Sequence, residues 1–216
     1  MSPDSPPGQL RAWITRHLDP LDTAILGGMP VHGDLSLDPG HVSDPDATWT
    51  AAAVLVGLVQ REEGLTVLLT RRADTLRNHT GQVAFPGGRS DPGETPWQTA
   101  LREAHEEIGL DPSRVELAGL STPFRTAVTG YQITPVIGFI EPGFTLTPNP
   151  AEVADIFETP FGFIMDPANL TPQERETPAG DRRRFYAATW EGQYIWGATA
   201  GMLRALYDRL YGAAVA

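Results

Sequence analysis

The sequence predicts an α/β fold in which a mixed β-sheet lies between helices. Apolar runs rich in β-branched residues, which favour strands, occur at 51–60, 65–69, 115–120, 132–140 and 185–190. Residues 96–108 and 198–210 instead carry apolar side chains at the three- and four-residue spacing of amphipathic helices. Strands interspersed with helices of this kind indicate a sheet covered by helices.

The first 48 residues are expected to form a helix and an arm that precede the compact domain. Leu10, Ile14 and Leu18 recur every four residues and predict a short amphipathic helix that packs on the core. Residues 19–48 are rich in Pro, Gly, Asp and Ser, which is typical of a loop. The compact domain is therefore expected to span residues 49–216.

Two hairpins are predicted from strand-like runs on either side of short turns. Residues 51–60 and 65–69 flank the turn-like sequence REEG. Residues 185–190 and 193–196 flank Glu191-Gly192, a dipeptide suited to a two-residue turn. The second hairpin begins with Arg182–Arg184, which we interpret as charges at a strand edge that resists aggregation.

Composition limits the classes of partner. The 216 residues include 16 basic residues, all arginine, against 27 acidic ones, for a net charge of −11. This charge disfavours generic nucleic-acid binding, which depends on an excess of cations. The apolar runs are shorter than the roughly 20 residues of a membrane-spanning helix, and the N-terminus does not resemble a secretory signal. We therefore expect a cytoplasmic protein that binds neither nucleic acid nor a membrane.

The helix expected at 96–108 has recognisable start and stop signals. Thr95 is a favourable N-cap, Pro96 suits the first helical position, and Gln98 completes a capping box. Gly109 is a typical left-handed C-terminal cap. Both ends of the helix are thus predicted to within a residue.

Three carboxylates, Glu103, Glu106 and Glu107, fall on one arc of this helix, beside its apolar stripe. Like charges at this spacing repel one another, and a bound divalent cation would reverse the sign of that interaction. Because cysteine is absent, a metal must bind oxygen or imidazole. Carboxylates on successive turns suit Mg²⁺ or Mn²⁺. The alternative is a solvated acidic face without a ligand.

The sequence around this helix resembles the signature of the Nudix hydrolase family. Gly88 is followed after five residues by Glu94, and after seven more by REAHEEIGL at 102–110. The resemblance implies the Nudix α/β/α sandwich with a mixed sheet, to which the N-terminal helix and arm are added. It also implies metal-dependent cleavage of a nucleoside diphosphate linked to another group.

The same resemblance implies roles for individual residues. Glu103 and Glu107 are implied to be the principal Mg²⁺ or Mn²⁺ ligands, and Gly88 to contribute its backbone carbonyl. Glu106 is implied to be a further ligand or the catalytic base. In this family the base is a glutamate of the signature or of a downstream loop, and Glu152 occupies such a loop. We rank Glu106 narrowly above Glu152 as the base.

A second motif, at 68–88, resembles the signature of the coenzyme A pyrophosphatase branch of the family. It comprises Leu-Leu-Thr, then Arg72, Arg77, Gly81 and Phe-Pro-Gly-Gly, with Ala73 where the branch often has Ser. It implies that the small-molecule substrate is coenzyme A, or its acyl or oxidised form, and that the products are 3′,5′-ADP and 4′-phosphopantetheine. Arg72 and Arg77 suit phosphate oxygens and, with Phe85, are the predicted substrate-binding residues. For each arginine the alternative is a surface ion pair.

Other functions remain open on the sequence. Another Nudix hydrolase, acting on ADP-ribose, a dinucleotide or a nucleoside triphosphate, would use residues 68–81 as scaffold only. A non-catalytic nucleotide sensor would be expected to have lost carboxylates of the signature, yet all are present. Whether the chain forms a homodimer is also open.

Overall fold

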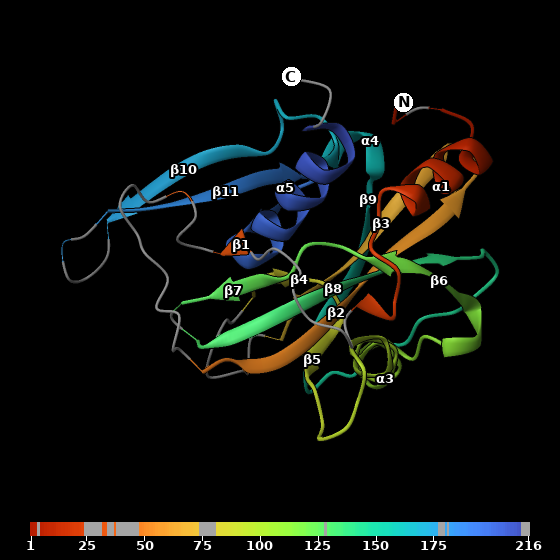
Figure 1. Cartoon of the computed structure of the whole chain (residues 1–216), viewed down its shortest axis with the longest axis horizontal. Coiled ribbons are helices and arrows are strands. Elements are labelled where there is room, and N and C mark those ends of the chain that lie inside the picture. Colours follow the sequence, from red (N-terminus) through yellow and green to blue (C-terminus); the bar gives the residue numbers. More distant parts are fainter. Residues whose placement is uncertain are drawn as a thin grey trace.

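A computed structural model describes residues 1–3, 5–23, 32–33, 37, 48–73, 81–127, 129–176, 180 and 182–212. Within these ranges the chain forms a large mixed sheet, a small antiparallel sheet and helices that cover them (Figure 1). The helices are α1 (Pro7–Arg16), α3 (Pro96–Ile108), α4 (Phe161–Ile164) and α5 (Ala198–Tyr211), with a 3₁₀ turn η1 (Pro112–Arg114). None of the described helices is long and apolar enough to cross a membrane.

The large sheet has nine strands in the described residues, built around a parallel central pair. Its path runs β1-β7-β8-β2-β3-β4, while β5 pairs with β2, β6 with β8 and β9 with β3. The strands are β1 (His32–Gly33), β2 (Thr50–Arg61), β3 (Gly64–Arg72), β4 (Val83–Ala84), β5 (Gly87–Arg89), β6 (Val115–Leu120), β7 (Phe124–Thr126), β8 (Tyr131–Ile140) and β9 (Val153–Pro160). The small sheet consists of β10 (Thr171–Glu176), β11 (Arg182–Trp190) and β12 (Gln193–Trp196), in that order.

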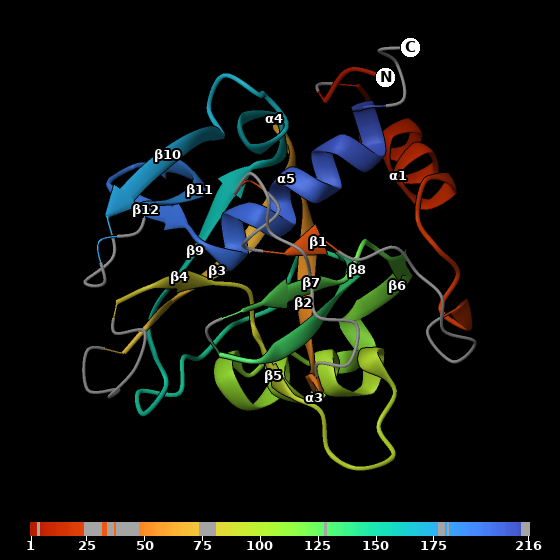
Figure 2. The ribbon, with the colours of Figure 1, turned by 60° about the vertical axis from the view of Figure 1, so that its left-hand side comes forward.

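The central strand β2 is buried on both faces because alternate side chains enter two separate cores. Val54, Val56 and Leu58 belong to the core that contains α1 and α5, whereas Leu55 and Val59 belong to the core beneath α3. Figure 2 shows α3 on one side of the large sheet and α1 and α5 on the other. The predicted α/β sandwich with a mixed sheet is therefore confirmed.

The predicted N-terminal helix is present and is part of the core. Leu10 and Ile14 are fully buried, and the ring centroid of Trp13 lies 4.9 Å from that of Tyr211 in α5. The arm was expected to be a loop, but His32–Gly33 form β1, which pairs in parallel with β7. The boundary near residue 49 stays a prediction, since the described parts of 1–48 pack against the same sheet as the rest.

Most predicted elements are confirmed. The β2–β3 and β11–β12 hairpins form, and Glu191 and Gly192 both have positive φ, 46° and 81°, as their two-residue turn requires. The interpretation of Arg182–Arg184 as a strand edge was wrong, because β11 is the middle strand of the small sheet. Strand β10, which was not predicted, covers that edge.

Candidate active site

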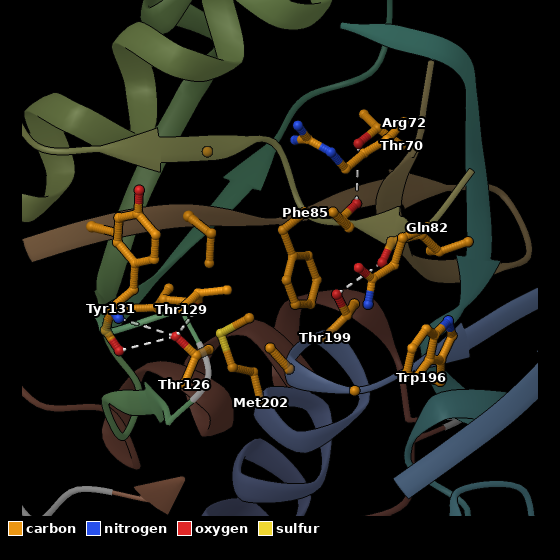
Figure 3. A pocket seen from close by; sticks show the side chains of 18 of the residues that line it. Thr70, Arg72, Gln82, Phe85, Thr126, Thr129, Tyr131, Trp196, Thr199 and Met202 are labelled. Atoms are coloured by element: carbon orange, nitrogen blue, oxygen red, sulfur yellow. Dashed lines mark hydrogen bonds between the residues drawn. The ribbon is translucent and has the colours of Figure 1, made fainter. Parts of the chain in front are cut away.

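A cavity of about 590 Å³ lies where the large sheet, the start of α5 and the small sheet meet. Five of the predicted site residues line it: Arg72, Phe85, Gly88, Glu107 and Glu152. Figure 3 shows Phe85 pointing into the middle of this cavity, with Tyr131 to one side and Trp196 to the other. Residues from both sequence motifs therefore meet in one cavity.

Helix α3 presents two of its carboxylates to strand β5. The predicted capping box of Thr95 and Gln98 is confirmed, and Gly109 ends the helix in a left-handed conformation with φ 67°. The buried stripe of the helix turns Glu107 inward, so its side chain is only 5% exposed. There its Oε2 accepts a hydrogen bond of 3.3 Å from the Gly87 backbone N–H.

The carboxylate of Glu103 lies directly against Gly88. A Cβ atom built on Gly88 would lie 2.5 Å from the Glu103 Cδ, so glycine is required for this approach. Gly88 is also in register with Ala53 of β2, which fixes β5 on the sheet. The Gly-Gly strand and α3 thus hold the Glu103 and Glu107 carboxylates beside the same short piece of backbone.

Burial and like charge give Glu107 an unusual electrostatic environment. Loss of solvent raises its pKa to about 8, and the negative charges of Glu103 and Glu152 act in the same direction. The Gly87 N–H and the Arg72 charge oppose this increase only in part. Burial likewise raises the pKa of Glu103, against the effect of Arg102. The site is therefore short of positive charge.

These residues fit a divalent cation. A buried carboxylate with a single hydrogen bond and two carboxylates nearby would be stabilised by a cation, and Mg²⁺ typically uses only one or two protein carboxylates. Within the described part of the chain, no three His, Asp or Glu side chains are grouped closely enough to form a complete metal cage. We keep Glu103, Glu107 and the Gly88 carbonyl as the proposed ligands.

Glu106, the third predicted ligand, is directed elsewhere. Its side chain is 54% exposed, does not line the cavity and accepts a hydrogen bond of 3.2 Å from Arg102 Nη1. Arg102 also binds Glu103 and, through two further nitrogens, Glu94. Glu106 therefore belongs to an ion-pair network on the outer side of α3.

Strand β9 brings Glu152 to the cavity. It pairs with β3 so that the Ala73 N–H donates a hydrogen bond of 2.9 Å to the Glu152 carbonyl, next to Arg72. The Arg72 Nε is buried and has no hydrogen-bond partner in the described residues. An unsatisfied guanidinium nitrogen on the cavity wall is suited to an anionic ligand. Arg77, the other predicted phosphate contact, lies outside the described residues.

The wall formed by the small sheet was missed by sequence reasoning. Arg175, Arg183, Phe185 and Trp196 all line the cavity, together with Met202 of α5. The only signal in the sequence was the predicted 185–196 hairpin, whose position relative to the carboxylate helix depends on tertiary contacts. These residues add arginine and aromatic side chains to a site otherwise rich in carboxylates.

The two glycines of β5 predict contrasting variants. In Gly88→Ala the new methyl group meets only the movable end of Glu103, so we expect a folded protein whose metal affinity falls about 10- to 100-fold. In Gly87→Ala the Cβ would lie 2.4 Å from the Ala53 carbonyl oxygen, and we expect a loss of about 1–3 kcal/mol or more in unfolding free energy. Mn²⁺ titration and urea unfolding of both variants measure these effects. Equal stability of the two variants would contradict the assignment.

The pair of Glu94 and Arg102 predicts a pH-dependent contribution to stability. Arg102 and the Asp91 N–H, as donors to the carboxylate, lower the pKa of Glu94 from 4.5 to about 2. A lowered folded-state pKa stabilises the protein above about pH 4.5, and this contribution disappears as the pH falls toward 2. We expect Glu94→Gln to cost about 1–3 kcal/mol at pH 7 and much less at pH 2.5, as measured by urea unfolding. A cost that does not change with pH would be contrary to this expectation.

Comparisons with known proteins agree with the geometry. The sequence matches the family model described as the NUDIX domain over residues 49–188. It is 41% identical over 160 residues to a Yersinia enterocolitica protein named uncharacterized Nudix hydrolase NudL, covering 74% of this chain and 80% of that protein. A Yersinia pestis protein of the same name is 40% identical over 165 residues, covering 76% and 81%. The solved structure of a Nudix hydrolase from M. smegmatis, RenU, aligns with a TM-score of 0.49 and 21% identity over 87% of this chain and 94% of that chain.

Proposed function

This chain belongs to the Nudix hydrolase family, and on that premise we propose that it hydrolyses the diphosphate bond of coenzyme A in a metal-dependent reaction. The products would be 3′,5′-ADP and 4′-phosphopantetheine, and acyl or oxidised coenzyme A are further candidate substrates. One observation carries the proposal. Thr70, Arg72 and Phe85 of the second motif line the same cavity as Glu107 of the Nudix signature.

The residues of the cavity suggest how the reaction is divided among them. Mg²⁺ or Mn²⁺, held by Glu103, Glu107 and the Gly88 carbonyl, would supply charge stabilisation and lower the pKa of a bound water. Arg72 donates hydrogen bonds from its guanidinium to phosphate oxygens, which positions the diphosphate over the carboxylates. Phe85, 3% exposed, packs its ring against the substrate at the cavity centre.

For the catalytic base we favour Glu152 over Glu106. Glu152 lines the cavity, whereas Glu106 is directed away from it and is bound by Arg102. The Glu152 carboxylate accepts a proton from water as the water oxygen attacks one phosphorus in line. The bond from that phosphorus to the bridging oxygen breaks, and the other phosphate leaves. No covalent intermediate is needed.

Comparative hydrolysis tests the proposal. Coenzyme A, ADP-ribose, NADH and ATP are each incubated with the protein and Mg²⁺ or Mn²⁺, with EDTA as the control, and the products are separated by chromatography. We expect metal-dependent release of 3′,5′-ADP from coenzyme A with the highest kcat/KM of the four. Faster cleavage of ADP-ribose, NADH or ATP would overturn the proposed substrate and leave a different Nudix hydrolase. Cleavage of none would revive the nucleotide sensor.

A further inference from the structure

We infer that the small sheet binds a second phosphate group of the substrate, apart from the diphosphate, between Arg175 and Arg183. This inference rests on the proposed function, because it concerns the substrate of the same cavity. The Nudix signature lines that cavity from α3 and β5, whereas these two arginines come from β10 and β11. The cavity thus has an acidic wall and, on different elements, a basic one.

Strand register places the two arginines on one face of the small sheet. Arg175 and Arg183 are directly opposite each other in the antiparallel β10–β11 ladder, so their side chains project from the same side. Phe185 follows two residues after Arg183 and therefore shares this face. The Phe185 ring lies 5.6 Å from the Trp196 ring, and the Arg175 guanidinium lies 5.7 Å from the Trp196 centroid. Two cations and two aromatic rings thus form one continuous surface toward the cavity.

The opposite face of the same sheet has its charges balanced. Glu174 lies 3.1 Å from Arg182 and 3.5 Å from Arg184, so one carboxylate serves two guanidinium groups there. Arg184 also reaches the cavity lining, but its charge is shared with Glu174. Among the described residues, neither Arg175 nor Arg183 forms an ion pair.

Such an arrangement is unfavourable without a ligand. Like charges directly opposite each other destabilise an antiparallel pair. The chain has 27 acidic residues, so a carboxylate partner for these arginines would be easy to supply. A pair of arginines without carboxylates, facing a cavity, is therefore better explained by an anion that enters the cavity.

The chemistry of the pair indicates a phosphate monoester. Two guanidinium groups match the charge of about −2 and the several acceptor oxygens of such a group, whereas a carboxylate needs only one guanidinium. The Trp196 and Phe185 rings beside the pair offer stacking surfaces for a nucleobase. In coenzyme A the 3′-phosphate is carried by the adenosine, so this assignment directs the adenosine half toward the small sheet.

A substrate pair that differs only in this phosphate tests the inference. The kcat/KM values for coenzyme A and 3′-dephospho-coenzyme A are measured for the wild type, Arg183→Gln and the matched control Arg182→Gln, whose side chain is on the opposite face. We expect Arg183→Gln to lose about 10- to 100-fold on coenzyme A and less than about threefold on the dephospho form. Arg182→Gln, an exposed residue, is expected to stay within about twofold on both. Equal losses on the two substrates, or no loss, would overturn the inference.

Product binding separates this inference from the proposed function. Calorimetry compares the Kd of 3′,5′-ADP with that of 5′-AMP, which lacks the 3′-phosphate, and requires no turnover. We expect the wild type to prefer 3′,5′-ADP by about tenfold or more and Arg183→Gln to lose that preference. Cleavage of coenzyme A without this preference would sink the inference alone, and the preference without cleavage would sink the proposed reaction alone. Because Arg183→Gln removes a repulsion, its Tm should not be lower than that of the wild type.

Discussion

Glu107→Gln is expected to lower kcat/KM at least about a thousandfold while leaving the fold intact. A metal-bound site supplies several kcal/mol of charge stabilisation, and each 1.4 kcal/mol is about a factor of ten in rate. Gln keeps the size of the side chain and has an oxygen that can accept the Gly87 hydrogen bond. The measurement is steady-state hydrolysis with Mn²⁺, with Glu63→Gln, an exposed residue in the β2–β3 turn, as the control.

The same variant should be more stable than the wild type when metal is removed. The Glu107 pKa is raised to about 8 in the folded state, so folding binds protons between about pH 4.5 and 8 and wild-type stability falls as the pH rises through that range. Gln has no proton to lose and escapes this penalty. In EDTA at pH 8 the variant should therefore melt at a higher temperature, by about 2–4 °C for each kcal/mol. A lower Tm together with lost activity would indicate a structural role for Glu107.

Glu152→Gln is expected to lower kcat about 10²- to 10⁴-fold with a small change in metal affinity. This range is typical of the loss of a positioned general base. Glu106→Gln should have the smaller effect, since Glu106 lies outside the cavity and is bound by Arg102. Single-turnover rates and Mn²⁺ affinity of both variants distinguish the two roles. A larger loss of rate in Glu106→Gln would restore Glu106 as the base.

The sequence predicted best those elements whose stability is local or whose burial pattern is strong. Helix α3 was predicted to the residue, because its caps at Thr95 and Gly109 are coded within a few positions of its ends. Strand β2 was recognised because it is apolar on both faces. Strand β10, by contrast, has six exposed residues and no apolar side chain to indicate it. Its formation depends on pairing with β11.

For the site, the sequence pointed to the right residues but not to their surroundings. The Nudix resemblance is confirmed, and the motifs identified Arg72, Phe85 and Glu107, which the fold brings to one cavity. The orientation of Glu106 was not predictable, since the helical wheel alone places it on the same arc as Glu103 and Glu107. The contribution of Arg183 was missed for a different reason. It depends on where the small sheet docks, which is a long-range contact.

The packing of α1 against α5 has a consequence for the ends of the chain. Both helices lie outside residues 49–188, the segment that matches the family model, and they meet through Trp13 and Tyr211 and through the ion pair of Asp19 with Arg209. The opposite end of α5 reaches the cavity through Thr199 and Met202. One rigid rod therefore links the N-terminal helix to the substrate-binding wall. Fusions or deletions before residue 17 should accordingly be judged by substrate affinity as well as by solubility.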